Sequence, residues 1–108
     1  MTMTEPSRQS LAELAQVIRS KNAGPTQLTI DVFLRDAQAY ALAARSPALL
    51  CAAVAARYGL AEHQVQRHLL AGIQAIKYVL PRAVVAGSPG DGDVYGAQQH
   101  GPMLDIVP

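Results

Sequence analysis

Residues 26–34, TQLTIDVFL, give the clearest secondary-structure signal in the chain. Leu28, Ile30, Val32 and Leu34 alternate with glutamine, threonine and aspartate. Successive side chains of a β-strand point to opposite faces, so this alternation predicts a strand with one apolar and one polar face.

The segment that follows this strand predicts two short helices in succession. Asp36 can cap a helix over residues 37–45. Ser46 and Pro47 then combine a hydroxyl cap with a proline in the first helical turn, which is a second start signal. Gly59 is well placed to end this second helix.

Two segments fit more than one secondary structure. Residues 11–18, LAELAQVI, can be read as a helix or as a strand. In residues 62–80 the apolar positions repeat at helical spacing, yet Gly72 weakens a helix interior and the end of the segment, IKYVLP, has the composition of a strand. Both interpretations stay open on these grounds. The repeating positions are Val65, Leu69, Ile73, Ile76 and Leu80.

The two ends of the chain differ in character. Residues 1–9 are polar, and we expect a flexible N-terminus there followed by a single domain over residues 10–108. Residues 103–107, MLDIV, predict a closing strand with Met103 or Leu104 and Ile106 facing the core.

Composition excludes several classes of protein. The net charge of +1 is too small for a nucleic-acid surface, and the longest apolar stretch, Ala48 to Ala56, is far short of the ~20 residues that span a membrane. No signal peptide is evident, and Cys51 is the one cysteine, so no internal disulfide forms. We therefore expect a cytoplasmic protein with neither nucleic-acid nor membrane partners.

A first polar cluster follows residues 11–18. Two cations, a hydroxyl, an amide and a glycine there make a plausible cradle for a carboxylate or phosphate, although a solvated loop is an equally good interpretation. The cluster does not have the pattern of a phosphate-binding P-loop. Its residues are Arg19, Ser20, Lys21, Asn22 and Gly24.

A second polar cluster lies in residues 90–100, GDGDVYGAQQH, and it can bind a ligand or hold its own loop against the core. The calcium-loop glutamate is missing and no histidine has a zinc spacing, so we expect neither metal nor cofactor. The candidate residues are Asp91, Asp93, Tyr95, Gln98, Gln99 and His100.

Residues 18–33, IRSKNAGPTQLTIDVF, and residues 80–106, LPRAVVAGSPGDGDVYGAQQHGPMLDI, resemble the domain of unknown function 4387 family of small bacterial proteins. The resemblance runs from about Leu11 to Pro108. That family in turn is similar to the small C-terminal domain of acyclic terpene utilisation (AtuA-like) proteins, in which an RSGDKG-type turn occupies this place. Here Lys21 and Asn22 stand where those relatives have Gly-Asp, which puts a transferred ligand role in doubt.

The resemblance implies an α+β, ferredoxin-like fold, with a small antiparallel or mixed sheet and helices on one face. It also implies at least one strand within residues 62–80 and a meeting of the two polar clusters at one sheet edge. Because the small family is commonly encoded beside a separate large AtuA-like protein, it implies a small subunit of a two-chain enzyme.

Three hypotheses follow for the function. The first is an accessory small subunit of an AtuA-like enzyme that acts on an organic-acid or acyl-CoA-type substrate. The second is a free-standing hydratase or isomerase that uses His100 and Asp93 as acid and base. The third is a homo-oligomeric module that binds a small anion and pairs its edge strands between copies.

Overall fold

The computed structural model describes residues 9–82, 96 and 99–108. The expected flexible N-terminus, apart from its last residue, lies outside the described residues, as do the site candidates Asp91, Asp93, Tyr95 and Gln98. The elements in chain order are α1 (Leu11–Leu14), β1 (Ala15–Asn22), β2 (Gln27–Leu34), α2 (Ala37–Arg45), the 3-10 helix η2 (Pro47–Leu49), α3 (Cys51–Arg57), η3 (Glu62–Gln64), β3 (Gln66–Leu70), η4 (Ala71–Ile73), β4 (Ala75–Pro81) and η5 (Gly101–Met103).

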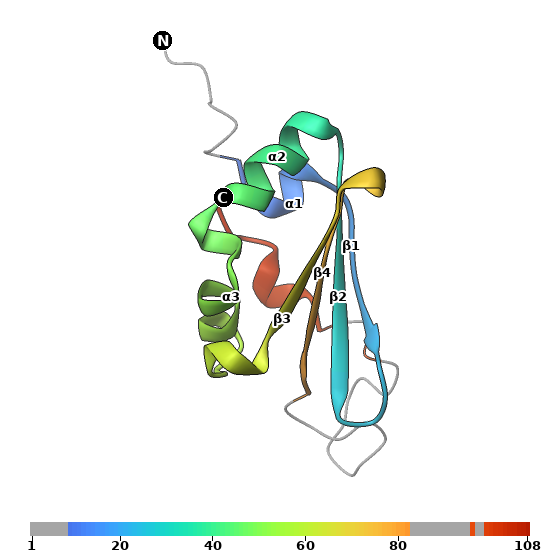
Figure 1. Ribbon diagram of the computed structural model, residues 1–108, viewed down its shortest axis with the longest axis vertical. Coiled ribbons are helices and arrows are strands. Elements are labelled where there is room, and N and C mark those ends of the chain that lie inside the picture. Colours follow the sequence, from blue (N-terminus) through green and yellow to red (C-terminus); the bar gives the residue numbers. More distant parts are fainter. Residues whose placement is uncertain (1–8, 83–95, 97–98) are drawn as a thin grey trace.

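The four strands form one antiparallel sheet in the order β1-β2-β4-β3. It consists of two hairpins, β1–β2 and β3–β4, which the segment containing α2 and α3 connects (Figure 1). The predicted α+β class, with a small antiparallel sheet and helices on one face, is confirmed. The elements are connected as two strands, a helical segment and two further strands.

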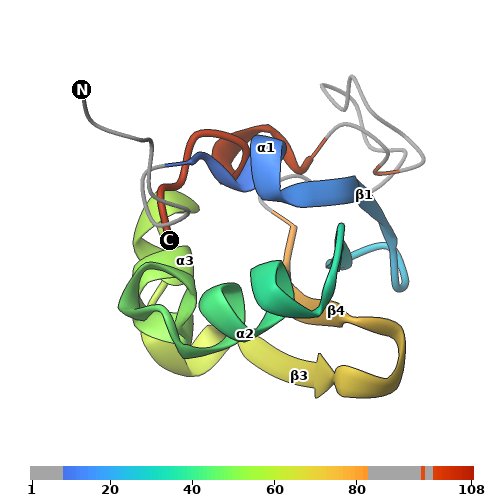
Figure 2. The same cartoon turned by 90° about the horizontal axis from the view of Figure 1, so that it is seen from above.

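The core lies between the sheet and the helices, which all lie on one side of it (Figure 2). We call this side the inner face and the opposite side the outer face. All four apolar residues that alternate along β2 are at most 2% exposed, which confirms the predicted strand and its buried face. Ile76, Tyr78 and Leu80 of β4 pair with them and share that face. Burying each such aliphatic side chain stabilises the fold by about 1.5–3 kcal/mol.

The predicted helix signals are present, but the second helix, expected to begin at Pro47, is divided at the extended Leu50 into a 3-10 helix and α3. The Asp36 carboxylate accepts a hydrogen bond from the backbone N–H of Ala39 at 2.8 Å and caps α2. Ser46 caps η2, and α3 begins directly afterwards at Cys51. Gly59 has φ 67°, a conformation that glycine adopts without strain, and it follows the end of α3.

Both ambiguous segments contain strands. Residues 11–18 hold α1 and then the first half of β1, so each interpretation describes one part of the segment. Residues 62–80 form the hairpin β3–β4, and the strand that we expected there is confirmed. The helical spacing in this segment was a coincidence, because Leu69 and Ile73 are 51% and 61% exposed.

The predicted closing strand over residues 103–107 is wrong. Gly101–Met103 form a 3-10 turn, in which Leu104 N–H donates to the carbonyl of Gly101 at 3.1 Å. Met103 and Ile106 are nevertheless buried, because a turn brings residues three apart to the same side. Leu11 N–H donates to Ile106 at 2.6 Å, so this segment packs on α1 instead of joining the sheet.

No helix in the described ranges has the length and hydropathy that crossing a bilayer requires.

Candidate functional site

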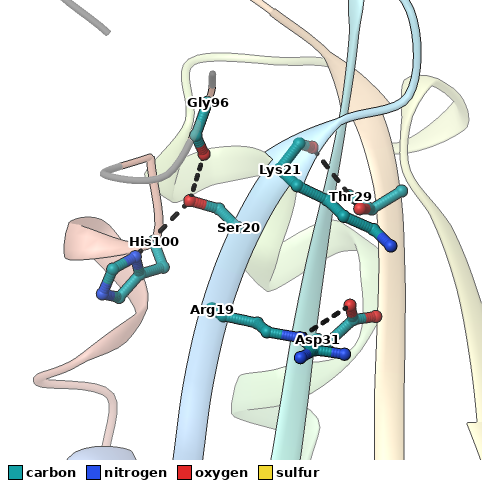
Figure 3. A network of polar contacts seen from close by, with 7 residues as sticks. All are labelled: Arg19, Ser20, Lys21, Thr29, Asp31, Gly96 and His100. Atoms are coloured by element: carbon teal, nitrogen blue, oxygen red, sulfur yellow. Dashed lines mark hydrogen bonds and ion pairs between the residues drawn. The ribbon is translucent and has the colours of Figure 1, made fainter.

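Four of the five residues of the first polar cluster lie on a strand, and Gly24 follows in the turn. β1 continues to Asn22, so the side chains of residues 19–22 alternate between the two faces of the sheet. Ser20 pairs with Ile30 and faces inward, whereas Arg19 pairs with Asp31 and faces outward (Figure 3). Arg19 and Lys21 therefore share the outer face, and Ser20 is separated from them by the sheet.

Ser20 joins the two polar clusters that the sequence separates. Its side-chain hydroxyl donates to the carbonyl of Gly96 at 2.5 Å and accepts a hydrogen bond from the backbone N–H of Gln99 at 2.9 Å. Ser20 is only 5% exposed. Because the hydroxyl proton is committed to a carbonyl, this serine serves as a link between segments and is not poised as a nucleophile.

The geometry around Ser20 also sets the direction of its contact with His100. Nδ1 of His100 lies 3.4 Å from Ser20 Oγ (Figure 3). Since the serine proton points to Gly96, a hydrogen bond here requires that Nδ1 carries the proton and donates it to Oγ.

Gly96 fits closely against the backbone of β1. It has φ 71°, and a Cβ atom at this position would lie 2.6 Å from Asn22 Oδ1 and 2.9 Å from Asn22 N. A side chain here would be both strained and in collision with backbone, so only glycine allows the segment to approach β1 this closely.

Residues 99–106 are tied to the helices as well as to β1. The Tyr58 hydroxyl donates to the carbonyl of Gln99 at 2.8 Å, and burial raises the pKa of Tyr58, which keeps it a donor. Arg57 donates to Asp105 at 2.6 Å and to the carbonyl of Pro102 at 3.2 Å. The described polar groups of the second cluster thus hold their own segment in place.

The outer face carries a row of three charged side chains and one histidine that crosses the whole sheet. Arg19, Asp31, Lys77 and His68 occupy directly paired positions on β1, β2, β4 and β3. Nε of Arg19 lies 3.6 Å from Asp31 Oδ2, and its guanidinium carbon lies 5.0 Å from the centroid of the Phe33 ring. The arginine is held in place by an ion pair and a cation–π contact.

Positive charge predominates on this outer face. Lys21 and Lys77, the only lysines of the chain, both lie on it together with Arg19, and among the described strand residues of this face Asp31 is the one carboxylate. Val17 beside them is 47% exposed. A face with this charge excess and exposed apolar side chains is suited to contact an acidic surface of a partner.

A hollow beside α3 brings together Cys51, Glu62, His63 and Val65. No hydrogen bond or ion pair joins its thiol, carboxylate and imidazole within the described ranges, so they do not form an activated set. Neither here nor anywhere else in the described residues do three histidine, cysteine, aspartate or glutamate side chains gather where they could hold a metal ion.

The structure divides the predicted site residues into three groups. Ser20, Gln99 and His100 meet at β1, and Asn22 lies beside them against Gly96. Arg19 and Lys21 lie on the outer face, and Gly24, with φ 117°, lies in the β1–β2 turn. The remaining four candidates, in residues 91–98, are outside the described residues.

Sequence reasoning missed several contributors to these contacts. Gly96 and Tyr58 carried no local signal, because their roles depend on partners far away in the chain. Asp31 and Lys77 had a usable signal: pairing residues 15–22 with residues 27–34 as a hairpin would have placed Arg19 opposite Asp31.

The family model described as "Domain of unknown function (DUF4387)" matches residues 11–107. No curated protein and no solved structure matches the chain.

Proposed function

The chain belongs to the DUF4387 family, and from this premise we propose that it is an accessory small subunit of a heteromeric enzyme. Its partner is a large AtuA-like chain, and the pair acts on an organic-acid or acyl-CoA-type substrate. The large chain and the substrate class come from the resemblance of residues 18–33 and 80–106 to the AtuA-like small domain.

The observation that carries this proposal is that the described polar groups at β1 are bonded within the chain. The Ser20 hydroxyl donates to the Gly96 carbonyl and accepts from the backbone N–H of Gln99, and so fixes the C-terminal segment. A self-contained enzyme needs such groups aimed at a substrate, together with an acid or base in reach. The described residues supply a rigid scaffold, which supports an accessory role.

The outer face of the sheet supports a role in binding another protein. No described helix lies on this face (Figure 2). It combines the row defined by Arg19, Asp31, Lys77 and His68 with two exposed apolar side chains, Val17 and Leu70. Arg19 is pre-positioned by Asp31 and Phe33, so little side-chain entropy would be lost on docking. We assign the large subunit to this face.

The direct test is purification of the tagged protein from its native host, with mass spectrometry of the proteins that accompany it. We expect a large AtuA-like chain in an amount equal to the tagged protein. Recovery of the tagged protein alone, in repeated preparations, would contradict the proposal and favour a free-standing enzyme.

A pair of charge reversals tests the assignment of the face. Lys21→Glu changes an exposed residue of the outer face, and Arg45→Glu makes the same change at an exposed residue of α2 on the other side of the sheet. We expect Lys21→Glu to reduce the captured partner several-fold, because it removes charge complementarity. Equal capture by the two variants would move the partner to another surface.

A further inference from the structure

The two edges of the sheet differ in what lies beyond them. Gly96 packs against β1 at Asn22, whereas Figure 2 shows no ribbon beyond β3. Four of the five residues of β3 are exposed. An uncovered edge strand presents backbone groups that can pair with another strand.

Two hydrogen bonds show which backbone groups of β4 point toward β3. Leu34 N–H donates to the carbonyl of Gln74 at 2.9 Å, and Arg82 N–H donates to the carbonyl of Thr26 at 2.9 Å. Backbone groups alternate in direction along a strand, so the even-numbered residues of β4 face β2. The odd-numbered residues Ala75, Lys77 and Val79 therefore face β3.

The same alternation then applies to β3. Gln66, His68 and Leu70 lie opposite Val79, Lys77 and Ala75, and these three pairs are the hydrogen-bonded ones. The N–H and C=O groups of Arg67 and Leu69 consequently point away from the sheet. Outside the strand ladders, no backbone hydrogen bond within the described ranges uses these four groups.

The strand has few of the features that usually block pairing at an edge. β3 contains no lysine, acidic residue or proline, and its register with β4 has no bulge. The guanidinium of Arg67 is bound by the carbonyls of Leu49 and Ala44 in its own chain, so it does not guard the edge. Leu69 is half exposed beside it.

We propose that β3 pairs with β3 of a second copy of this chain, antiparallel and about a two-fold axis that passes beside His68. In this register Arg67 of each copy lies opposite Leu69 of the other. All four outward-pointing N–H and C=O groups of each strand are then satisfied across the axis. The two four-stranded sheets become one continuous sheet.

The geometry favours a second copy over an unrelated strand. If the register shifts in either direction, some outward N–H and C=O groups of Arg67 or Leu69 no longer face outward groups of β3 in the other copy. In the two-fold register all of these groups are paired. This register also places the exposed Leu69 side chain on the aliphatic stem of Arg67 from the other copy. Because a two-fold contact uses the β3 edge of both copies, the pairing closes at a dimer.

Cysteine cross-linking tests both the dimer and its register, with the purified chain alone and therefore independently of any large subunit. In a Cys51→Ala background, His68→Cys places two thiols at a non-hydrogen-bonded pair with a Cα separation of about 4.5 Å, which a disulfide spans. Gln66→Cys is the matched control on the same strand face, where the two thiols lie about 13 Å apart along the strands.

We expect mild oxidation to give a covalent dimer of the His68→Cys variant and none of the Gln66→Cys variant. Sedimentation equilibrium should show a dimer for the unmodified chain, a monomer for Leu69→Lys and a dimer for Ile73→Lys, which alters an exposed residue just outside β3. A monomeric unmodified chain, equal cross-linking of the two cysteine variants, or a dimer that survives Leu69→Lys would each overturn the proposal.

Discussion

The two edge strands of this sheet, β1 and β3, both carry backbone groups that point away from the sheet, and the chain treats them differently. At β1, a distant segment is brought in by Ser20 and fits because residue 96 is a glycine. At β3, the chain supplies no covering segment within its described part, and apolar side chains flank the outward backbone groups. One edge is completed by tertiary structure, and the other is available for assembly.

Substitution of Gly96 should have the largest effect on this contrast. Gly96→Ala forces a side chain into a left-handed conformation and into backbone atoms of Asn22, and we expect a loss of about 3 kcal/mol in the free energy of unfolding. Urea denaturation measures it. Gly72→Ala is the control, because a Cβ there meets nothing within 4 Å, and it should leave the midpoint unchanged. Equal midpoints for both variants would show that β1 is not sealed by this segment.

Removal of the Ser20 hydroxyl should have an intermediate effect. Ser20→Ala leaves the carbonyl of Gly96 and the N–H of Gln99 without their partner, which costs about 2 kcal/mol. Lys21→Ala, at the neighbouring exposed position on the outer face, should change the stability by less than about 0.5 kcal/mol. Amide exchange of Gln99 gives a local readout, and unchanged protection in Ser20→Ala would contradict the assigned role of the hydroxyl.

The open edge should contribute least to the stability of a single chain. Leu69→Ala removes a side chain that is 51% exposed, so the free energy of unfolding, measured at concentrations below dimerisation, should change by less than about 0.5 kcal/mol. A loss comparable to that of Ser20→Ala would mean that Leu69 packs within its own chain, and the contrast between the edges would then disappear.

The sequence was sufficient for the features that depend on local periodicity or capping. The alternation of Leu28 to Leu34 and the cap at Asp36 act over a few residues, and both appear in the structure. The apolar residues Met103 and Ile106 indicated a strand, whereas they belong to a 3-10 turn and the residues after it. Both a strand and a turn can bury apolar residues at such a spacing. The choice depended on contacts with α1 that no local pattern encodes.

The candidate site was harder to predict because adjacency in sequence is not adjacency on a strand. Arg19 and Ser20 looked like neighbours in one cradle, yet a strand sends them to opposite faces. Their partners, Asp31 for one and Gly96 for the other, are set by hairpin register and by long-range packing. Among the described residues, the two polar clusters come together only where Ser20 and Asn22 contact residues 96, 99 and 100.

The hydrogen bonds from Leu11 and Ala12 to Ile106 and Leu104 have a consequence for synthesis of the protein. A ribosome makes α1 and both hairpins before it makes the residues that pack against β1. Until Gly96 and Gln99 emerge, the nascent chain carries two unprotected edges in place of one, and premature pairing at β1 would lead to open-ended aggregates. Chaperone protection of this intermediate would matter more than the stability of the finished fold suggests.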